Sequence, residues 1–198
     1  MLRIPGMAAH KLILHPANPT ALPTGERNSA ALLRDIGLIG DSSKLDGKYH
    51  YFTGDGFLSL VTFLGCAPTI ETPPPAGAAE LAEAARARRF CHISLGDTLP
   101  APRLRADPCS RARCPVCRKM QTWSGPGTDD STRITMSCGH CHVDSPIEEC
   151  SWRQNGGVAR LFVDIWGVYP SEAVPGDLLL HTLATVTESP WVWFYSMR

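Results

Sequence analysis

The chain has 198 residues, of which 43% are hydrophobic and 19% are charged. This composition is typical of a folded globular protein and excludes a wholly disordered chain. Its 19 basic and 19 acidic residues give a formal net charge of zero, which argues against a protein built to bind phosphates over its whole surface. The length fits one domain, or one domain with a small appendage, and we expect the second arrangement.

Two apolar stretches bear on where the protein resides. The N-terminal stretch MLRIPGMAAHKLILHPANP contains no apolar run long enough for a signal-peptide core, because His10, Lys11 and His15 interrupt it. The most apolar segment, residues 57–70, contains Pro68 and is shorter than the roughly 20 residues of a membrane-spanning helix. We therefore expect a cytoplasmic protein with no membrane contact.

The first predicted elements are a short helix and a strand. Residues 28–37 (NSAALLRDIG) place Asn28 at the N-cap of a helix and Gly37 at its stop. The sequence KYHYF at 48–52 is typical of a strand. Both elements belong to the part of the chain that precedes a Pro-rich interruption.

A central core helix is predicted over residues 54–65 (GDGFLSLVTFLG). Asp55 stands at a capping position, apolar residues follow at helical spacing, and Gly65 stands where a helix would end. After the Pro-rich segment 71–79, the Ala-rich residues 78–89 predict a second helix, because acidic residues precede basic ones in the order that complements the helix dipole.

The remaining predicted elements are three strands and a helix. Residues 90–95 (FCHISL) and 158–169 (VARLFVDIWGVY) are rich in β-branched and aromatic residues, which favours strands. A helix is predicted from Pro175 and a strand at 191–195 (WVWFY). The aromatic residues of this last strand alternate and share one face, where we expect core packing rather than a protein-binding surface.

Four of the eight cysteines form two Cys-x-x-Cys pairs, CPVC and CGHC. Eight cysteines in a chain of this size are too few for a small disulfide scaffold, so a metal site in a reducing compartment explains the pairs better. Structural zinc takes four tetrahedral ligands and commonly binds thiolates, and a Cys-x-x-Cys turn aims two sulfurs at one point. We expect one structural zinc ion bound by Cys114, Cys117, Cys138 and Cys141.

These two turns resemble the paired knuckles of zinc-ribbon proteins. The match covers the 28 residues from Cys114 to Cys141, in which RKMQTW and STRITMS flank a turn rich in Gly, Pro and Asp. The resemblance implies a bound metal and a β-hairpin with one knuckle near each end. Zinc ribbons in general bind nucleic acid, bind proteins or brace a fold, so the resemblance alone leaves the function open.

Other uses of the four thiols remain open: a rubredoxin-like iron site, a labile disulfide pair, or coincidence of spacing. His140 and His142 are less suited as ligands, because His140 lies between two better-placed thiols, and we expect exposed turn histidines. Four thiolates leave no open catalytic position on the metal. The other four cysteines lack paired spacing; they are Cys66, Cys91, Cys109 and Cys150. Of these, Cys109 and Cys150 flank the module and are expected to be ordinary buried thiols.

The region around the first cysteine pair is strongly basic. From Arg86 to Lys119 there are nine Arg or Lys residues and two Asp, an excess of seven positive charges. Bases directly beside a four-thiolate zinc centre could stabilise its negative charge, but the number here exceeds what one centre requires, so we expect an anionic partner. An acidic stretch at 129–149 could instead pair with these bases. The candidate partner-binding residues are Arg111, Arg113, Arg118 and Lys119.

The expected fold class is α+β, a single mixed core with an inserted zinc-ribbon β-hairpin module. Residues 1–98 would form the N-terminal α/β part of the core, and residues 109–150 the zinc-ribbon module. Residues 151–198 would form a strand–helix–strand unit that packs on the N-terminal part, since this unit is too small for a core of its own.

The expected function is a non-catalytic adaptor or assembly factor that binds another protein. The chain lacks a phosphate-binding loop, a Gly-x-Ser-x-Gly elbow and a His-Glu-x-x-His motif, which leaves open only an enzyme whose residues meet in three dimensions. The alternative is a nucleic-acid-binding protein that uses the basic segment 86–119. Trp123 is the aromatic residue beside the first cysteine pair that could stack on a base.

Overall fold

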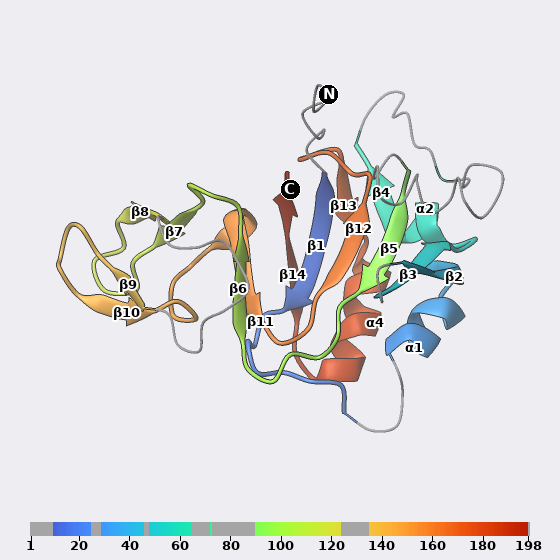
Figure 1. Cartoon of the computed structure of the whole chain (residues 1–198), viewed down its shortest axis with the longest axis horizontal. Helices are drawn as coiled ribbons and strands as arrows, with labels where there is room; N and C mark the ends of the chain where they lie inside the picture. Colours follow the sequence, from blue (N-terminus) through green and yellow to red (C-terminus); the bar gives the residue numbers. More distant parts are fainter. Residues whose placement is uncertain are drawn as a thin grey trace, which may run out of the picture.

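The computed structural model describes residues 10–24, 29–45, 48–64, 72, 90–123 and 135–197. Its main layer is a six-stranded sheet in which every neighbouring pair is antiparallel (Figure 1). In order across the sheet, the strands are β14 (Trp191–Ser196), β1 (Lys11–Pro16), β12 (Val163–Trp166), β5 (His92–Leu95), β3 (Lys48–Thr53) and β2 (Ile39–Leu45).

Four two-stranded sheets and a few helices complete the described structure. The pairs are β4 (Val61–Phe63) with β13 (Ala173–Pro175), β6 (Arg103–Ala106) with β11 (Gly156–Ala159), β7 (Arg111–Arg113) with β8 (Met120–Thr122), and β9 (Thr135–Ser137) with β10 (Asp144–Pro146). The helices are α1 (Ser29–Asp35), α2 (Phe57–Leu60), α4 (Asp177–Thr187) and the 3-10 turn η1 (Arg153–Asn155). None of the helices in the described part of the chain has the length and apolar character needed to cross a membrane.

The described part of the fold is therefore mixed and dominated by strands, with few helices. Figure 1 shows the six-stranded sheet with α1, α2 and α4 toward one end of the molecule, and β7 to β10 at the other end. Strands β6 and β11 lie between them. This arrangement places β7 to β10, the strands next to the paired cysteines and here called the cysteine-bearing strands, away from the main sheet.

One face of the six-stranded sheet packs against the helices to form the main core. Side chains alternate between the two faces of a strand, so Leu12 and Leu14 of β1 enter this core with Val163 and Ile165 of β12. Helix α4 contributes Leu179 and Leu183, which are one turn apart, as expected for an amphipathic helix. Burial of each such side chain stabilises the fold by about 1.5–3 kcal/mol.

Gly37 terminates helix α1, as predicted. The backbone N–H of Leu38 donates to the carbonyl of Leu33 at 2.9 Å, and the N–H of Gly37 donates to the carbonyl of Arg34 at 2.9 Å. These two bonds form a Schellman motif, which requires a left-handed residue after the helix. Gly37 supplies it with a φ of 76°, and a Cβ there would lie 2.9 Å from the backbone nitrogen of Gly56. The predicted N-cap, Asn28, lies outside the described residues.

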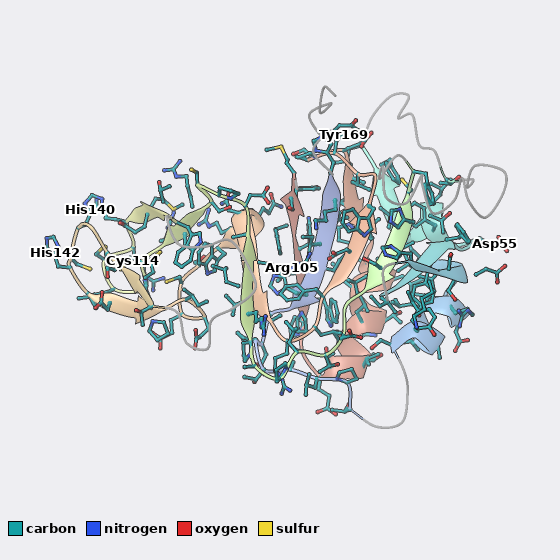
Figure 2. The ribbon with its side chains drawn as sticks, in the orientation of Figure 1. Asp55, Arg105, Cys114, His140, His142 and Tyr169 are labelled. Carbon is teal, nitrogen blue, oxygen red and sulfur yellow. The ribbon has the colours of Figure 1, made fainter. Side chains whose placement is uncertain are left out.

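The predicted core helix over residues 54–65 is wrong. Only the four residues of α2 are helical, and the chain then enters strand β4. Val61 pairs with Pro175 and Phe63 with Ala173 of β13, so pairing with a distant segment overrides the local helical spacing. Gly56 occupies the N-cap position, whereas Asp55 is exposed at the edge of the molecule (Figure 2). Gly65 lies outside the described residues.

The strand predicted over residues 158–169 is two strands in the structure. Strand β11 pairs with β6, whereas β12 pairs with β1 and β5 of the main sheet. The chain changes sheets at residues 160–162, where the Arg160 side chain donates to the carbonyl of Leu99 at 2.7 Å. The predicted strands at 48–52, 90–95 and 191–195 and the helix after Pro175 are confirmed as β3, β5, β14 and α4. The Ala-rich helix predicted at 78–89 lies outside the described residues.

A second core lies between β6–β11 and the strands that carry the cysteines. Trp123 and Trp152 meet edge to face in it, with ring centroids 5.8 Å apart, and Nε1 of Trp152 donates to the carbonyl of Ile147 at 2.8 Å. This cluster consists of Leu104, Ala106, Ala112, Trp123, Met136, Ile147, Cys150, Trp152 and Val158. The cysteine-bearing strands therefore have their own apolar support.

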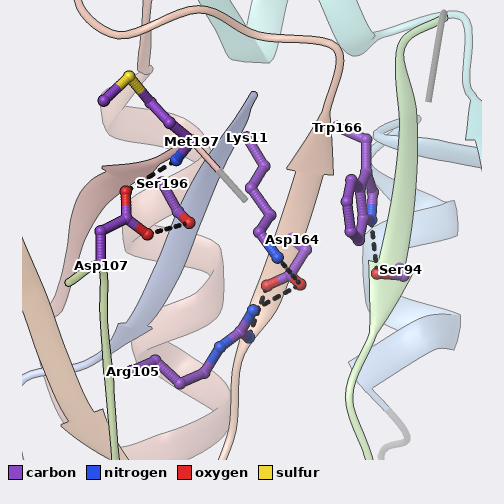
Figure 3. A network of polar contacts seen from close by, with 8 residues as sticks. All are labelled: Lys11, Ser94, Arg105, Asp107, Asp164, Trp166, Ser196 and Met197. Carbon is purple, nitrogen blue, oxygen red and sulfur yellow. Dashed lines mark hydrogen bonds and ion pairs between the residues drawn. The ribbon is translucent and has the colours of Figure 1, made fainter. Parts of the chain in front are cut away.

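Polar contacts join β6 to the main sheet (Figure 3). Arg105 of β6 donates to both carboxylate oxygens of Asp164 on β12, at 2.7 and 2.8 Å. Asp107 accepts hydrogen bonds from the Ser196 hydroxyl at 2.6 Å and from the backbone N–H of Met197 at 2.8 Å. Strand β6 is thus connected to β12 and to the end of β14, which fixes the base on which the cysteine-bearing strands are built.

Candidate metal centre

The four paired cysteines lie in the turns of two hairpins. Strands β7 and β8 pair up to Arg113 and Met120, so the first Cys-x-x-Cys sequence connects them. In strands β9 and β10, Ser137 pairs with Asp144, so the second Cys-x-x-Cys sequence connects these two strands. The resemblance implied one hairpin with a knuckle near each end; the described residues form two hairpins, each closed by one knuckle. We call them the two cysteine hairpins.

The two turns have the same backbone conformation. In each, the residue four positions after the first cysteine is left-handed: Arg118 has a φ of 62° and His142 a φ of 58°. The N–H of that residue donates to the carbonyl of the first cysteine, at 3.1 Å for Cys114 and 2.9 Å for Cys138. Non-glycine residues with positive φ are uncommon. Their recurrence at equivalent positions indicates that both turns meet the same requirement, the aiming of two sulfurs at one point.

The four sulfur atoms converge. All of them lie within 4.8 Å of one another, and the Sγ–Sγ distance is 3.8 Å between Cys114 and Cys141 and 3.5 Å between Cys117 and Cys138. A tetrahedral zinc site with Zn–S bonds of about 2.3 Å places its sulfurs about 3.8 Å apart, whereas a disulfide bond is about 2.05 Å long. The cluster therefore has the size of a four-sulfur metal site and could hold one metal ion.

Backbone amides favour the thiolate form at the first cysteine of each pair. Hydrogen bonds from the N–H groups of Cys141 and His140 lower the pKa of Cys138 to about 6, and the backbone N–H of Cys117 lowers the pKa of Cys114. At Cys141 a backbone hydrogen bond from Val143 acts in the same direction, but burial and the neighbouring sulfurs outweigh it and raise the pKa to about 11. Four thiolates at this separation repel one another, and a divalent cation would remove that penalty.

Contacts around the cluster hold the two hairpins together. The side-chain oxygen of Gln121 on β8 accepts a hydrogen bond from the backbone N–H of Gly139 in the second turn, at 3.0 Å. Arg113 forms a backbone bridge to Ser151, beyond β10. Sequence reasoning missed Gln121, because glutamine carries no metal-ligand signal and its role depends on the meeting of two turns that are distant in sequence.

The other described cysteines and the two turn histidines lie outside the four-sulfur cluster. Cys150 is buried as expected, and burial is the main reason that its pKa is raised to about 11. Cys109 was expected to be buried, but it is exposed in a left-handed turn. His140 and His142 are exposed as predicted and lie at the outer end of the molecule (Figure 2). Cys91 is buried in the main core, and Cys66 lies outside the described residues.

The predicted partner-binding cations surround the first turn. Arg111, Arg118 and Lys119 are exposed, and Arg113 is half-buried. The ion pairs formed within the described ranges involve Asp164 and include none of these four cations. Arg105, which belongs to the same basic segment, is instead held by Asp164. The local acidic residues that the structure describes therefore do not neutralise the predicted cations by direct pairing.

Near the two turns, the valine side chains are exposed, whereas the tryptophan side chain is buried. Val116 in the first turn is 60% exposed and Val143 in the second is 39% exposed. Trp123, the aromatic residue available for base stacking according to the sequence, is buried in the second core and only 5% exposed. The accessible surface of the two turns thus includes aliphatic, cationic and imidazole groups.

Comparison with known proteins yielded no match to a family model, to a curated protein or to a solved structure. A site is therefore indicated by the cluster of four converging cysteines in the described residues, which could hold a metal ion.

Proposed function

We propose that Cys114, Cys117, Cys138 and Cys141 bind one structural zinc ion, and that residues 109–150 form a zinc-ribbon module inserted before the last strand–helix–strand unit. Thiolates are common ligands of structural zinc, and the convergence of four sulfurs from two equivalent turns supports this assignment. Four protein ligands fill a tetrahedral shell, so no position remains for a reactive water. The metal would therefore stabilise the module rather than perform chemistry.

The function that we propose for the protein is that of a non-catalytic cytoplasmic adaptor or assembly factor, which binds an acidic surface of another protein. The observation that carries this proposal is the composition of the exposed turns: Arg111, Arg118 and Lys119 are exposed and lack ion pairs among the described residues, and they stand beside exposed Val116 and Val143. Protein interfaces combine apolar contacts with a polar rim, and this surface offers both.

A nucleic-acid-binding role is the second candidate. The first cysteine hairpin favours it, because residues 109–123 carry four cations and no acid. Two observations weigh against it. The chain has no net positive charge, and the burial of Trp123 removes the aromatic ring that would stack on a base.

Metal analysis combined with charge reversal tests these proposals. We expect one equivalent of zinc per purified chain, and its removal by a chelator should unfold the two cysteine hairpins, because metal binding and folding are coupled in such modules. Iron, or fewer than about half an equivalent of any metal after expression in zinc-supplied cells, would contradict the metal assignment.

The partner proposal is tested with the double variant Arg118→Glu and Lys119→Glu, in which both cations of the first turn become acidic. Proteins cross-linked to the wild type in cells should be lost from this variant but retained by the control Lys44→Glu, which reverses an exposed cation on β2 of the main sheet. Fluorescence polarisation with single-stranded and duplex oligonucleotides separates the two candidates. Binding that weakens steeply with salt and disappears in the double variant would replace the adaptor by a nucleic-acid-binding protein.

A further inference from the structure

A cavity of about 360 Å³ lies where the second core meets the main sheet. This volume falls within the range of small-molecule sites, which occur frequently at junctions between structural units. Its walls include His15 and Val192 from the sheet, Gly157 and Val158 from β11, and Cys150 and Trp152 from the segment before η1. His15 and Val192 are cross-strand partners, so both side chains are on the sheet face that packs against β11.

His15 presents an acceptor nitrogen. Its Nδ1 lies 2.8 Å from the carbonyl oxygen of Pro16, and because a carbonyl can only accept, Nδ1 carries the proton and Nε2 carries the lone pair. Only 6% of His15 is exposed, and burial lowers its pKa to about 4, so the ring is neutral at pH 7. Nε2 has no hydrogen-bond partner among the described residues. Because His15 lines the cavity, this nitrogen is available to accept a hydrogen bond from a molecule bound there.

Gly157 packs closely against the His15 ring. A Cβ on Gly157 would lie 2.0 Å from Nε2, closer than any side chain can approach. Position 157 therefore has to be glycine for His15 to occupy its place, and both residues line the cavity. The rest of the wall is largely apolar and includes Trp152, Val158 and Val192.

The charged residues that border the cavity are at its mouth. Glu148 and Arg153 both line it, and both are exposed to solvent. A charged ligand group would therefore have to lie at the rim, whereas a group deep in the cavity would face Trp152 and aliphatic side chains. Aromatic rings pack favourably against an indole ring such as that of Trp152.

We propose that this cavity binds a small, uncharged aromatic molecule whose single N–H or O–H group donates a hydrogen bond to Nε2 of His15. The inference is independent of the proposed adaptor function, because it uses none of the exposed cations of the cysteine hairpins. Such a ligand would pair with the acceptor nitrogen of His15 and fill the apolar space at the same time.

Indole and 1-methylindole form a matched pair of probes, since they share the ring and differ in the N–H donor. Titration of the zinc-loaded, ¹⁵N-labelled protein should move the Nε2 resonance of His15 saturably with indole. One net hydrogen bond predicts that 1-methylindole binds about two- to twelve-fold more weakly. In His15→Phe, which keeps an aromatic ring and removes the acceptor, the two affinities should become equal. The control His181→Phe, at an exposed histidine of α4, should preserve the preference for indole.

Three results would overturn the proposal: equal wild-type affinities for the two probes, a preference for indole that survives in His15→Phe, or indole binding that leaves the His15 resonance unchanged. Survival of the preference would mean that the extra methyl group, rather than the lost donor, weakens binding. If His15→Phe does not fold, the wild-type titration decides alone, because it observes Nε2 directly and compares two ligands on one protein.

Discussion

Replacement of Arg105 by methionine removes the principal partner of a buried carboxylate. Asp164 is 8% exposed and accepts two charge-assisted hydrogen bonds from Arg105, and its remaining cationic neighbour is Lys11, with Nζ 3.9 Å away. Loss of one member of a buried ion pair typically costs about 3–5 kcal/mol. Since Lys11 stays and the Arg105 side chain is 23% exposed, we expect the lower end of that range, a decrease of about 3 kcal/mol in the free energy of unfolding.

The double variant Arg105→Met with Asp164→Leu distinguishes the net contribution of the ion pair to the free energy of unfolding from the cost of leaving one partner unpaired. An apolar pair of similar volume often replaces a buried ion pair with little loss, so the double variant should recover to within about 1 kcal/mol of the wild type. The single variant Asp164→Leu should cost less than Arg105→Met, because the half-buried guanidinium can reach solvent and still packs over the Phe162 ring at 4.8 Å.

Urea denaturation of the zinc-loaded protein, followed by tryptophan fluorescence and by circular dichroism, measures these free energies. The coupling energy from the double-mutant cycle should reach about 2 kcal/mol or more. A coupling below about 0.5 kcal/mol, with additive single effects, would refute the reasoning, because that is the behaviour of an exposed pair that contributes little to stability.

Three further predictions concern single positions. Cys138→Ser should reduce the zinc content well below one equivalent and abolish amide exchange protection in β9 and β10; retention of both would contradict the four-thiolate site. The folded protein keeps His15 neutral, whereas in the unfolded chain His15 binds a proton below its ordinary pKa of 6.5. The free energy of unfolding should therefore fall by roughly 3 kcal/mol as the pH drops from 6.5 to about 4. His15→Phe should lack this share of the pH dependence in urea denaturation, and an equal pH dependence in the variant and the wild type would disprove it. Gly37→Ala forces a Cβ to 2.9 Å from a backbone nitrogen at a φ of 76° and should cost about 1–3 kcal/mol, whereas an unchanged melting temperature would show that the helix end can rearrange.

The four-cysteine cluster could be predicted from the sequence because its signal is local. Each Cys-x-x-Cys turn is formed by neighbouring residues, and their spacing already limits where two sulfurs can point. Helix α1 and its stop at Gly37 were predictable for the same reason, since the Schellman motif involves only adjacent turns of one helix. Strand β14 has alternating aromatic residues, and its inward-facing rings pack against the main core.

The errors lie where distant segments decide the local conformation. Residues 61–63 fit a helical period, but they pair with β13, more than a hundred residues later in the chain. The break between β11 and β12 reflects the presence of two sheets, each of which pairs with one half of a stretch rich in β-branched and aromatic residues. The role of His15 likewise depends on Gly157, which reaches it only through the packing of β11 on the main sheet. None of these partnerships leaves a periodic trace in the sequence.

The second core connects the metal centre to the cavity, and this connection yields a last prediction. Cys150, Trp152 and Val158 belong to the apolar cluster under the cysteine hairpins and also line the cavity. If zinc holds those hairpins in place, its removal should loosen this cluster and with it one wall of the cavity. Binding of zinc and of the aromatic ligand would then be coupled, and by linkage each would raise the affinity for the other by the same factor.

The coupling is measured by titrating indole into the zinc-loaded protein and into the chelated protein. We expect the His15 shift to become at least about fivefold less sensitive to indole after zinc removal, which corresponds to a coupling free energy of about 1 kcal/mol. The apo protein should retain the main sheet, because the Arg105–Asp164 pair and the main core contain none of the four clustered cysteines. Equal affinities in the two forms would mean that the cavity wall is held by β6, β11 and the main sheet alone, and that the metal stabilises only the outer turns.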